Sequence, residues 1–544
     1  MELTTPAPAI PVPEKPATSL GEKDSAFAAA MLVCGFLFFN LILFTAQPAA
    51  GTTVFALLTV AVTCIYLTKS GFKQTPKSLI SLALTIVASL HLLIFDNGLL
   101  FFLTFVFAAM LYVYWVMTTT GRSIDEKLTS SFIGDVAQQG FVVPFTNFGT
   151  GIAALAHRFK QGRFTGVVLG IVGILLFLPL LAAVVSLLVS ADLAFETFLT
   201  GATASLNLDD VMRYLWQLVL GIPVALYLFG LVYGNVTGRH TTTITKDSLA
   251  LTTRLIRIAP HVMIYAALAA FCLIYTLFFV VQGGYLFSGF TEKLPEAYTY
   301  AEYARRGFFE LCAVAGINLV VLSIAHLLTR RELEEQPREL RFFTALISVF
   351  TLLLIATALS KMVLYIATYA LTPLRVYTSW FMVLLAFIFV IVLVRQFVRF
   401  NAARLIIVGF VVLFFALSFG NVDGMIARYN IGVYEAALQA GEYERIDIEA
   451  FAELSDGAAD PLYAWYQRLD ERDVTQAELR QRIEEALMSR YSWDQNLIED
   501  GLARSSALPA NFRSFSLQRM RANQIRLELL EAGVAMPDYF VVDE

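Results

Sequence analysis

The chain has 544 residues, of which 58% are hydrophobic and only 15% charged, and its mean hydropathy is +0.67. Soluble globular proteins do not have this composition, so the sequence predicts an all-α, polytopic transmembrane helix bundle. The four cysteines lie in apolar runs without metal-ligand spacing, and the five histidines are scattered along the chain. No metal site, cofactor or catalytic residue is therefore predicted.

Residues 1–25 contain five prolines and almost no large apolar residue. Such a segment cannot bury a core, so we expect a disordered, Pro-rich cytoplasmic tail. The apolar run that follows is longer than the core of a cleavable signal peptide and is predicted to be the first membrane helix.

Eleven apolar runs come close to the roughly 20 residues that a membrane-spanning helix needs. Helices 1–4 fall in the N-terminal block 26–118, and helices 5–11 fall in the block 165–420. The third run is short, and the ninth is long enough that it must tilt, kink or protrude. The runs are 26–46, 49–69, 78–95, 98–118, 165–190, 212–235, 259–282, 307–328, 342–371, 373–394 and 404–420.

The number of lysine and arginine residues alternates between high and low in successive connections. The connections after even-numbered helices carry 19 basic residues, and those after odd-numbered helices carry 6. Because cytoplasmic loops hold the basic excess, this pattern predicts a cytoplasmic N-terminus and an external C-terminus.

The connection 119–164 is predicted to be cytoplasmic and amphipathic, with two helices. The apolar face of the second helix recurs at helical spacing: Ile152, Leu155, Ala156 and Phe159. Four basic side chains next to it are suited to anionic lipid headgroups: His157, Arg158, Lys160 and Arg163. The alternative is a connecting helix packed beneath the bundle.

The hairpin 361–377 places cations and tyrosines in an apolar setting. Lys361, Tyr365 and Tyr369 recur every four residues and share one helix face. Thr372 and Pro373 are typical of the N-cap and first position of a new helix, whose first turn contains Arg375.

Glu310 lies in the first turn of helix eight, which enters the membrane from the same outer side as this hairpin. We expect Glu310 to approach Lys361 or Arg375, with Tyr365 and Tyr369 lining a polar cavity open to the outside. The alternative is that Lys361 snorkels to the interface, where the tyrosines form an aromatic belt.

Residues 421–544 differ sharply from the rest, with 12 arginines, no lysine and 23 acidic residues, a net charge of −11. They predict an acidic, helical, extracytoplasmic domain that repels nucleic acid and offers a surface to a protein partner. Helix starts are expected at Asp460–Pro461 and at Thr475 with Glu478, and a further helix over 514–531.

The stretch NVDGMIARYN follows helix eleven without a flexible linker, so the domain is expected to dock on the outer helix ends. The polar residues of this stretch are the candidate docking residues: Asn421, Asp423, Arg428 and Asn430.

Three stretches together resemble a bacterial membrane protein family, the domain of unknown function 4173, which is kin of 4153. They are YAEYARRGFFEL (300–311), the hairpin 361–377 and NVDGMIARYN (421–430). The resemblance covers the chain from about helix four onward and implies a bacterial cytoplasmic-membrane protein with no assigned reaction. The chain departs from the family pattern at Ala370, where members carry glycine, and at Val422, where they carry proline.

Three functional classes remain open. The first is a non-catalytic envelope sensor or assembly scaffold, whose acidic domain binds a partner. The second is a transporter of a small molecule or lipid, although the polar residues near mid-membrane, Asn40, His91 and Asn318, are isolated. The third is a membrane glycosyl- or lipid-transferase, although the first outer loop is essentially Gln47 and Pro48 and lacks an acid.

Overall fold

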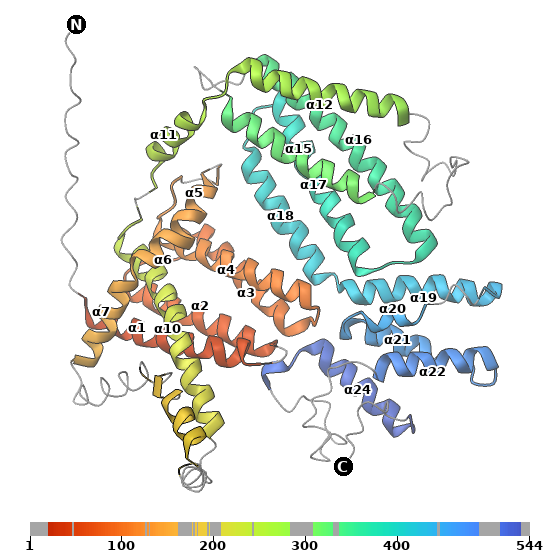
Figure 1. Cartoon of the computed structure of the whole chain (residues 1–544), viewed down its shortest axis with the longest axis horizontal. Helices are drawn as coiled ribbons and strands as arrows, with labels where there is room; N and C mark the ends of the chain where they lie inside the picture. The colour runs from red at the N-terminus through yellow and green to blue at the C-terminus, as the bar shows by residue number, and fades with distance from the viewer. Residues whose placement is uncertain are drawn as a thin grey trace.

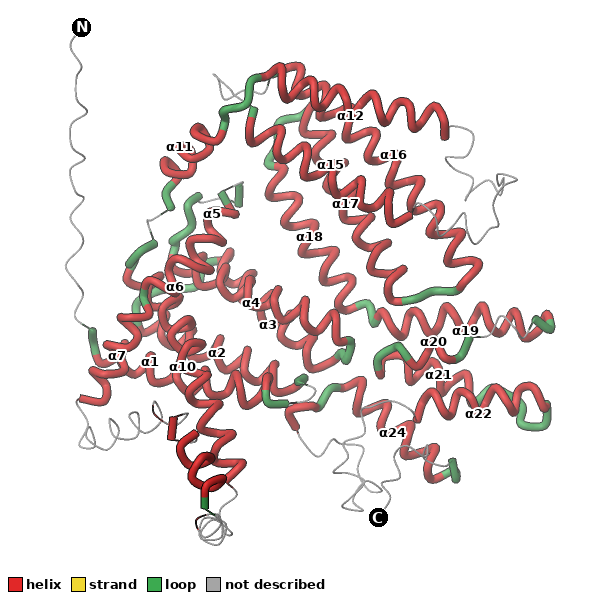
Figure 2. The backbone as a smooth tube through the Cα atoms, in the orientation of Figure 1, coloured by secondary structure: helices red, strands yellow, loops and turns green. Residues whose placement is uncertain are grey.

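A computed structural model gives the arrangement of the chain (Figure 1). It describes residues 20–45, 48–125, 128–129, 131–160, 177, 180–181, 183–192, 195, 208–241, 244–282, 308–329, 337–442, 447–488 and 512–534. Every regular element within these residues is a helix (Figure 2). The predicted all-α class is therefore confirmed.

The helices form two membrane halves, the segments that connect them and a C-terminal domain. The first half consists of α1 (Glu22–Phe38) with its π-helical extension η1 (Phe39–Leu43), α2 (Ala50–Lys69), α3 (Pro76–Ile94), α4 (Gly98–Thr120) and α10 (Leu208–Thr237). The second half consists of α12 (His261–Gln282), α15 (Phe308–Leu328), α16 (Arg338–Tyr369), α17 (Pro373–Phe397) and α18 (Ala402–Phe419). The connecting segments contain α5 (Phe132–Ala137), η2 (Gln138–Val142), α6 (Val143–Thr146), α7 (Phe148–Lys160) and α11 (Lys246–Ile256). The domain contains α19 (Val422–Ala440), α20 (Glu449–Ala452), η4 (Asp456–Ala458), α21 (Ala459–Tyr466), α22 (Val474–Met488), η6 (Phe512–Ser514) and α24 (Leu517–Glu531).

Ten helices in the described part of the chain are long and apolar enough to cross a membrane, and each corresponds to a predicted run. The short third run is a complete helix of 19 residues, and the long ninth is α16, with 32 residues. The predicted fifth span at 165–190 lies largely outside the described residues, so the count of eleven stays a prediction.

Local capping signals set the starts of α3 and α4. Thr75 caps α3, because its side chain accepts a hydrogen bond from the Ser78 N–H at 3.2 Å. Asn97 caps α4 in the same way, with its Oδ1 accepting from the Leu100 N–H at 3.0 Å. Only 95–97 lie between the two helices, which places Asp96 at the tip of the hairpin.

The α16–α17 turn differs in one detail from its predicted form. Pro373 is the first residue of α17, as expected, but the side chain of Thr372 makes no capping hydrogen bond. A separate contact caps the C-terminal end of α16, where Nη1 of Arg375 donates to the carbonyl oxygens of Tyr369, at 2.7 Å, and Ala370. The chain leaves α16 through Ala370 with a φ of 60° and a ψ of −173°, a conformation that glycine adopts far more readily.

A close approach between two helices fixes the first half. On α1 and α10, a Cβ at Gly35 would lie 2.1 Å from the carbonyl oxygen of Gly221, so both helices need glycine there. Asn40 donates to Gln217 at 2.8 Å towards one end of this helix pair, and Phe27 meets Phe229 towards the other. The two helices therefore run antiparallel.

A single asparagine joins three helices of the second half. Asn318 on α15 accepts a hydrogen bond from the hydroxyl of Tyr275 on α12 and donates to Thr351 on α16 at 2.9 Å. The two halves meet at an aromatic seam, where Phe107 of α4 packs on Phe414 of α18 with ring centroids 4.7 Å apart. Trp380 of α17 packs against the same cluster.

The connection 131–160 packs against the end of α10. A Cβ at Gly230 would lie 2.3 Å from the carbonyl oxygen of Pro144, and Asn235 donates to Gln139 at 2.7 Å. The absence of side chains at Gly230 and Gly234 therefore lets this connection pack closely on α10.

The C-terminal domain has an apolar core around Tyr434, Phe451 and Trp465, which is continuous with buried residues at the ends of α4, α16 and α18. Its helix starts differ slightly from the predicted ones. Asp473, rather than Thr475, caps α22, since its Oδ1 accepts from the Thr475 N–H at 2.9 Å. Asp460 lies inside α21, because the 3₁₀ turn η4 leads directly into that helix.

Replacement of Ala370 by glycine should relieve the backbone strain at a φ of 60°. We expect Ala370→Gly to raise the unfolding free energy by about 1 kcal/mol, measured by denaturant titration in detergent. Ala367→Gly, three residues earlier in helical backbone, should lower it by about 1 kcal/mol. If both glycines destabilise equally, the conformation assigned to Ala370 is wrong.

Candidate functional site

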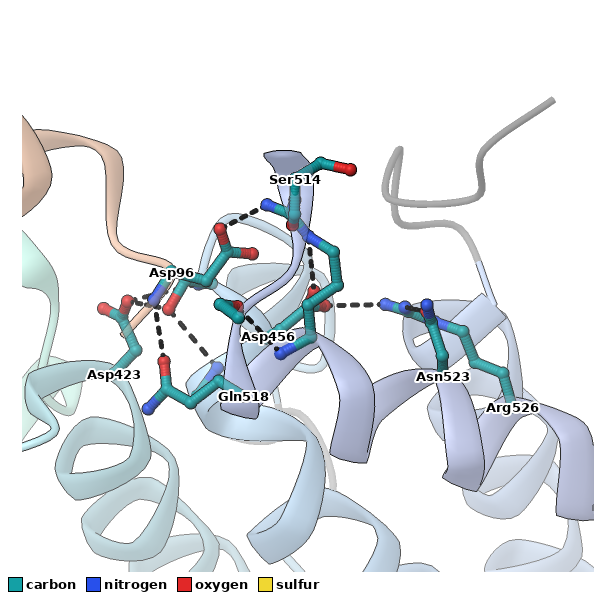
Figure 3. A network of polar contacts seen from close by, with 11 residues as sticks. Asp96, Asp423, Asp456, Ser514, Gln518, Asn523 and Arg526 are labelled. Carbon is teal, nitrogen blue, oxygen red and sulfur yellow. Dashed lines mark hydrogen bonds and ion pairs between the residues drawn. The ribbon is translucent and has the colours of Figure 1, made fainter. Parts of the chain in front are cut away.

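Buried charges fasten the C-terminal domain to the membrane helices (Figure 3). Arg519, in the first turn of α24, donates from Nη2 to Asp96 at the tip of the α3–α4 hairpin. Its Nε lies 3.9 Å from Oδ2 of Asp456. Asp456 also accepts from Nη2 of Arg526 at 2.8 Å, and the Asp456 and Arg526 side chains are only 2% and 1% exposed. We call Asp96, Asp456, Arg519 and Arg526 the junction network.

Local structure explains how the arginines are presented. Ser516 caps α24 by accepting from the Arg519 N–H at 3.2 Å, which sets the start of the helix. Arg519 and Arg526 are seven residues apart and therefore lie on one face, together with the buried Ala522 and Leu529. Two arginines on a buried helix face need acidic partners, and Asp96 and Asp456 supply them.

Burial raises the pKa of the Asp96 carboxyl, with Arg519 opposing the rise and Asp456 adding to it. The carboxyl side chain is 20% exposed, so it lies at the rim of the junction. One turn earlier, the His91 ring is 1% exposed and stacks on Phe95 with centroids 4.9 Å apart. Its Nδ1 has no hydrogen-bond partner among the described residues.

A second group of polar contacts lies beside the junction network. Asn97 donates to Asp423 at 2.8 Å, and Asp423 also accepts from the backbone N–H of Ser455 at 3.2 Å. Gln518 accepts from the Asp96 N–H at 3.0 Å and donates to Asn421 at 2.9 Å. The hairpin tip is thus bonded to two separate segments of the domain, α19 and α24.

Two further connections attach to the domain through backbone groups. The N–H groups of Ala49 and Ala50 donate to the carbonyls of Arg513 and Phe515, each at 3.0 Å. The side chain of Asn430 both accepts from the Leu371 N–H, at 2.8 Å, and donates to the Leu371 carbonyl, at 2.9 Å. The domain therefore covers the α1–α2, α3–α4 and α16–α17 connections, and it continues directly from α18.

These contacts place three of the predicted outer connections, and the end of α18, on one face of the bundle. On the opposite face, His157 near the end of α7 contacts Ser25 at the start of α1, with 3.1 Å between their polar atoms. The start of α10 lies towards the domain, since Gln217 pairs with Asn40 towards that end of α1. Residues 160 and 208 thus lie on opposite faces, as the predicted span at 165–190 requires.

The predicted docking residues have different surroundings. Asn421, Asp423 and Asn430 make the contacts described above, whereas the side chain of Arg428 is exposed on α19. Among the predicted headgroup residues, His157 contacts Ser25, the side chains of Arg158 and Lys160 lie outside the described set, and so does the whole of Arg163. Ile152, from the predicted apolar face, is 58% exposed, and Phe141 and Phe145 are similarly exposed.

The hairpin residues form a cluster at the end of α16. The Arg375 guanidinium lies over the Tyr365 ring, 4.1 Å from its centroid, and the Tyr365 and Tyr369 rings are 5.2 Å apart. Lys361, one turn deeper, is 8% exposed and interacts electrostatically with Glu310, which is exposed at the start of α15.

Asp456, Gln518, Arg519 and Arg526 were not recognised as site residues from the sequence. The one available signal was the seven-residue spacing of Arg519 and Arg526 within an apolar helix pattern. Within the described residues, no group of three or more His, Cys, Asp or Glu side chains is arranged to hold a metal ion. The junction network holds segments of the chain in place, and its acidic and basic side chains form ion pairs with one another.

A family model described as "Domain of unknown function (DUF4153)" matches residues 79–464, which is more than half of the chain. The matched part begins in α3 and ends within the C-terminal domain. Neither the curated proteins nor the solved structures gave a match.

Breaking the junction network should destabilise the protein strongly. Asp96→Ala and Arg519→Ala should each lower the unfolding free energy by about 3–5 kcal/mol, because each leaves a largely buried charge without its partner. The double variant should cost less than the sum of the two. As a control, Glu435→Ala should cost about 1 kcal/mol or less, since its ion pair with Arg468 is exposed. Equal losses in the junction and control variants would contradict a buried ion pair.

Charge reversal tests the pairing of Lys361 with Glu310. Lys361→Glu and Glu310→Lys should each reduce the yield of folded protein in detergent, and the double reversal should partly restore it. Lys69→Glu, which reverses an exposed lysine at the end of α2, should leave the yield unchanged. Two single reversals with wild-type yield would rule out a structural role for the pair.

Proposed function

The chain belongs to the DUF4153 family, and from this premise we propose that it is a non-catalytic sensor or assembly scaffold of the bacterial cytoplasmic membrane. In this proposal the N-terminus is cytoplasmic and the acidic C-terminal domain is outside, where it binds a protein partner. The excess of basic residues on the face opposite the domain supports this orientation.

Within this family we propose the closer relationship to the domain of unknown function 4173. The two departures from its pattern have simple structural accounts. Ala370 has a φ of 60°, which suits the glycine of that pattern. Val422 is the first residue of α19, a position where proline is favoured.

The observation that carries the proposed function is the attachment of one domain to both membrane halves. The junction network and the Ala49 contact hold it to the first half, and Asn430 and α18 hold it to the second. Because buried ion pairs hold the domain to the first half, and because hydrogen bonds and the chain itself hold it to the second, moving the domain changes the positions of both halves relative to each other. A partner that binds the domain would therefore act on the membrane helices.

The proposed partner surface is the acidic edge, which we define as four exposed acidic residues in and beside the connection between α19 and α20: Glu442, Asp447, Glu449 and Glu453. The net charge of −11 over 421–544 adds a long-range attraction for basic surfaces. A basic protein segment is the partner that this surface fits best.

The other two classes receive less support. The buried hydroxyls of Ser81, Thr85 and Ser89 in α3 each donate to a carbonyl of their own helix, so they do not line up as free groups along a transport path. A transferase needs an acidic side chain open to substrate on the outer face, whereas the Asp96 carboxylate is engaged by Arg519.

Complementation in the native bacterium tests the proposal. A photo-reactive residue at the exposed Ala452 should give a defined protein adduct. Neutralising the acidic edge with Asn and Gln should abolish both this adduct and complementation, without changing the melting temperature of the purified protein. Glu478→Gln with Glu485→Gln and Glu531→Gln, which neutralises exposed acids elsewhere, is the control and should retain both.

Full complementation without the acidic edge would refute a scaffold that works through this surface. Alkaline phosphatase fused after Glu544 gives an independent readout of orientation. Active phosphatase is expected. An inactive phosphatase fusion, together with fluorescence from a cytoplasmic reporter fused separately at the same residue, would refute an external domain.

A further inference from the structure

The helix α11 joins the two membrane halves on the face opposite the C-terminal domain (Figure 1). It follows α10 and precedes α12. Thr245 and Ser248 form a reciprocal cap, with the Ser248 N–H donating to the Thr245 hydroxyl at 3.1 Å and the Thr245 N–H donating to Ser248 at 2.8 Å. The helix therefore starts from its own local signal and is a separate element between two spans.

Large apolar side chains of this connection are uncovered. Leu251 and Leu255 are 59% and 68% exposed and lie on one face of α11, four residues apart. Ile258, just after the helix, is 75% exposed. Leaving water is favourable for side chains of this size, so a surface of this kind implies something that covers it.

The position of α11 identifies the bilayer as the cover. Only 257–260 separate it from α12, a link that reaches at most about 14 Å and therefore holds α11 close to the membrane surface. The apolar surface also continues into α12, whose Val262, Leu273 and Val280 are 79%, 72% and 74% exposed, as expected for side chains that face lipid.

The charge of the connection suits an anionic surface. Between α10 and α12 the sequence has four arginine or lysine residues and one acid: Arg239, Lys246, Arg254, Arg257 and Asp247. Interfacial helices combine an apolar face with basic residues in this way. Acyl chains cover the apolar face, and anionic headgroups attract the basic residues.

We propose that α11 is an interfacial lipid-binding helix. Its Leu251 and Leu255 face inserts at the boundary between headgroups and acyl chains, in the leaflet opposite the C-terminal domain, and its basic residues select anionic phospholipid. This inference does not depend on the proposed function. It makes α11 a lipid-anchored link whose depth in the leaflet bears on the spacing of the two halves.

Fluorescence quenching in lipid nanodiscs tests the position of α11. The full-length chain, with its four cysteines replaced by alanine, receives a single labelled cysteine at Leu255. A quencher attached to lipid near the headgroup should quench this probe strongly, and iodide in solution should not. A probe at Gln524, exposed on α24 of the C-terminal domain, is the control and should show the reverse.

Two outcomes would refute lipid insertion. Iodide quenching of the Leu255 probe equal to that of the control would place α11 in water. Shielding from both quenchers would indicate a second copy or another protein as the cover.

The lipid class is tested with brominated phosphatidylglycerol against brominated phosphatidylcholine. The anionic lipid should quench the Leu255 probe more strongly, and Lys246→Gln with Arg254→Gln should abolish this preference while leaving the total quenching unchanged. Equal quenching by both lipids in the parent chain would refute selection by charge, and so would a preference that survives these two substitutions.

Discussion

The contact between Asp96 and Arg519 determines how the domain sits on the membrane helices. Charges as buried as those of Arg519, Arg526 and Asp456 are stable only when they face one another, so the segments that carry them have little freedom to separate. The tight α3–α4 hairpin, the Ser516 cap and the η4 turn each place one of these groups. Once the domain has this position, the contacts of Ala49 and Asn430 can form as well.

The membrane helices were predictable because the bilayer imposes a length and a polarity that each run satisfies by itself. The ten described spans match predicted runs within a few residues for this reason. Helix caps were predicted less well, because several neighbouring residues can accept the same orphan N–H group. Asp473 replaces Thr475 at α22, and the cap expected from the Thr372 side chain on α17 does not form.

The candidate site was predicted only in part. Asn421, Asp423 and Asn430 were named as candidates because they follow a membrane helix without a linker, which is a local signal. Asp456, Arg519 and Arg526 acquire their role from pairing across long stretches of sequence, which no local pattern reveals. Asn40 and Asn318 illustrate the same point inside the membrane, since each looked isolated in its own helix and each bonds to a neighbouring one.

The sequence separation of the junction has a consequence for biosynthesis. Asp96 and Arg519 are 423 positions apart, so the α3–α4 hairpin is made long before its partner. At about 5–20 residues per second, translation alone takes roughly 20–85 s to bring Arg519 out of the ribosome. During that time the first half must persist with its Asp96 carboxylate in water. Chains that stop before α24 would therefore have inserted membrane helices without the C-terminal contacts on the α3–α4 hairpin. Quality-control proteases could distinguish this state from the finished protein.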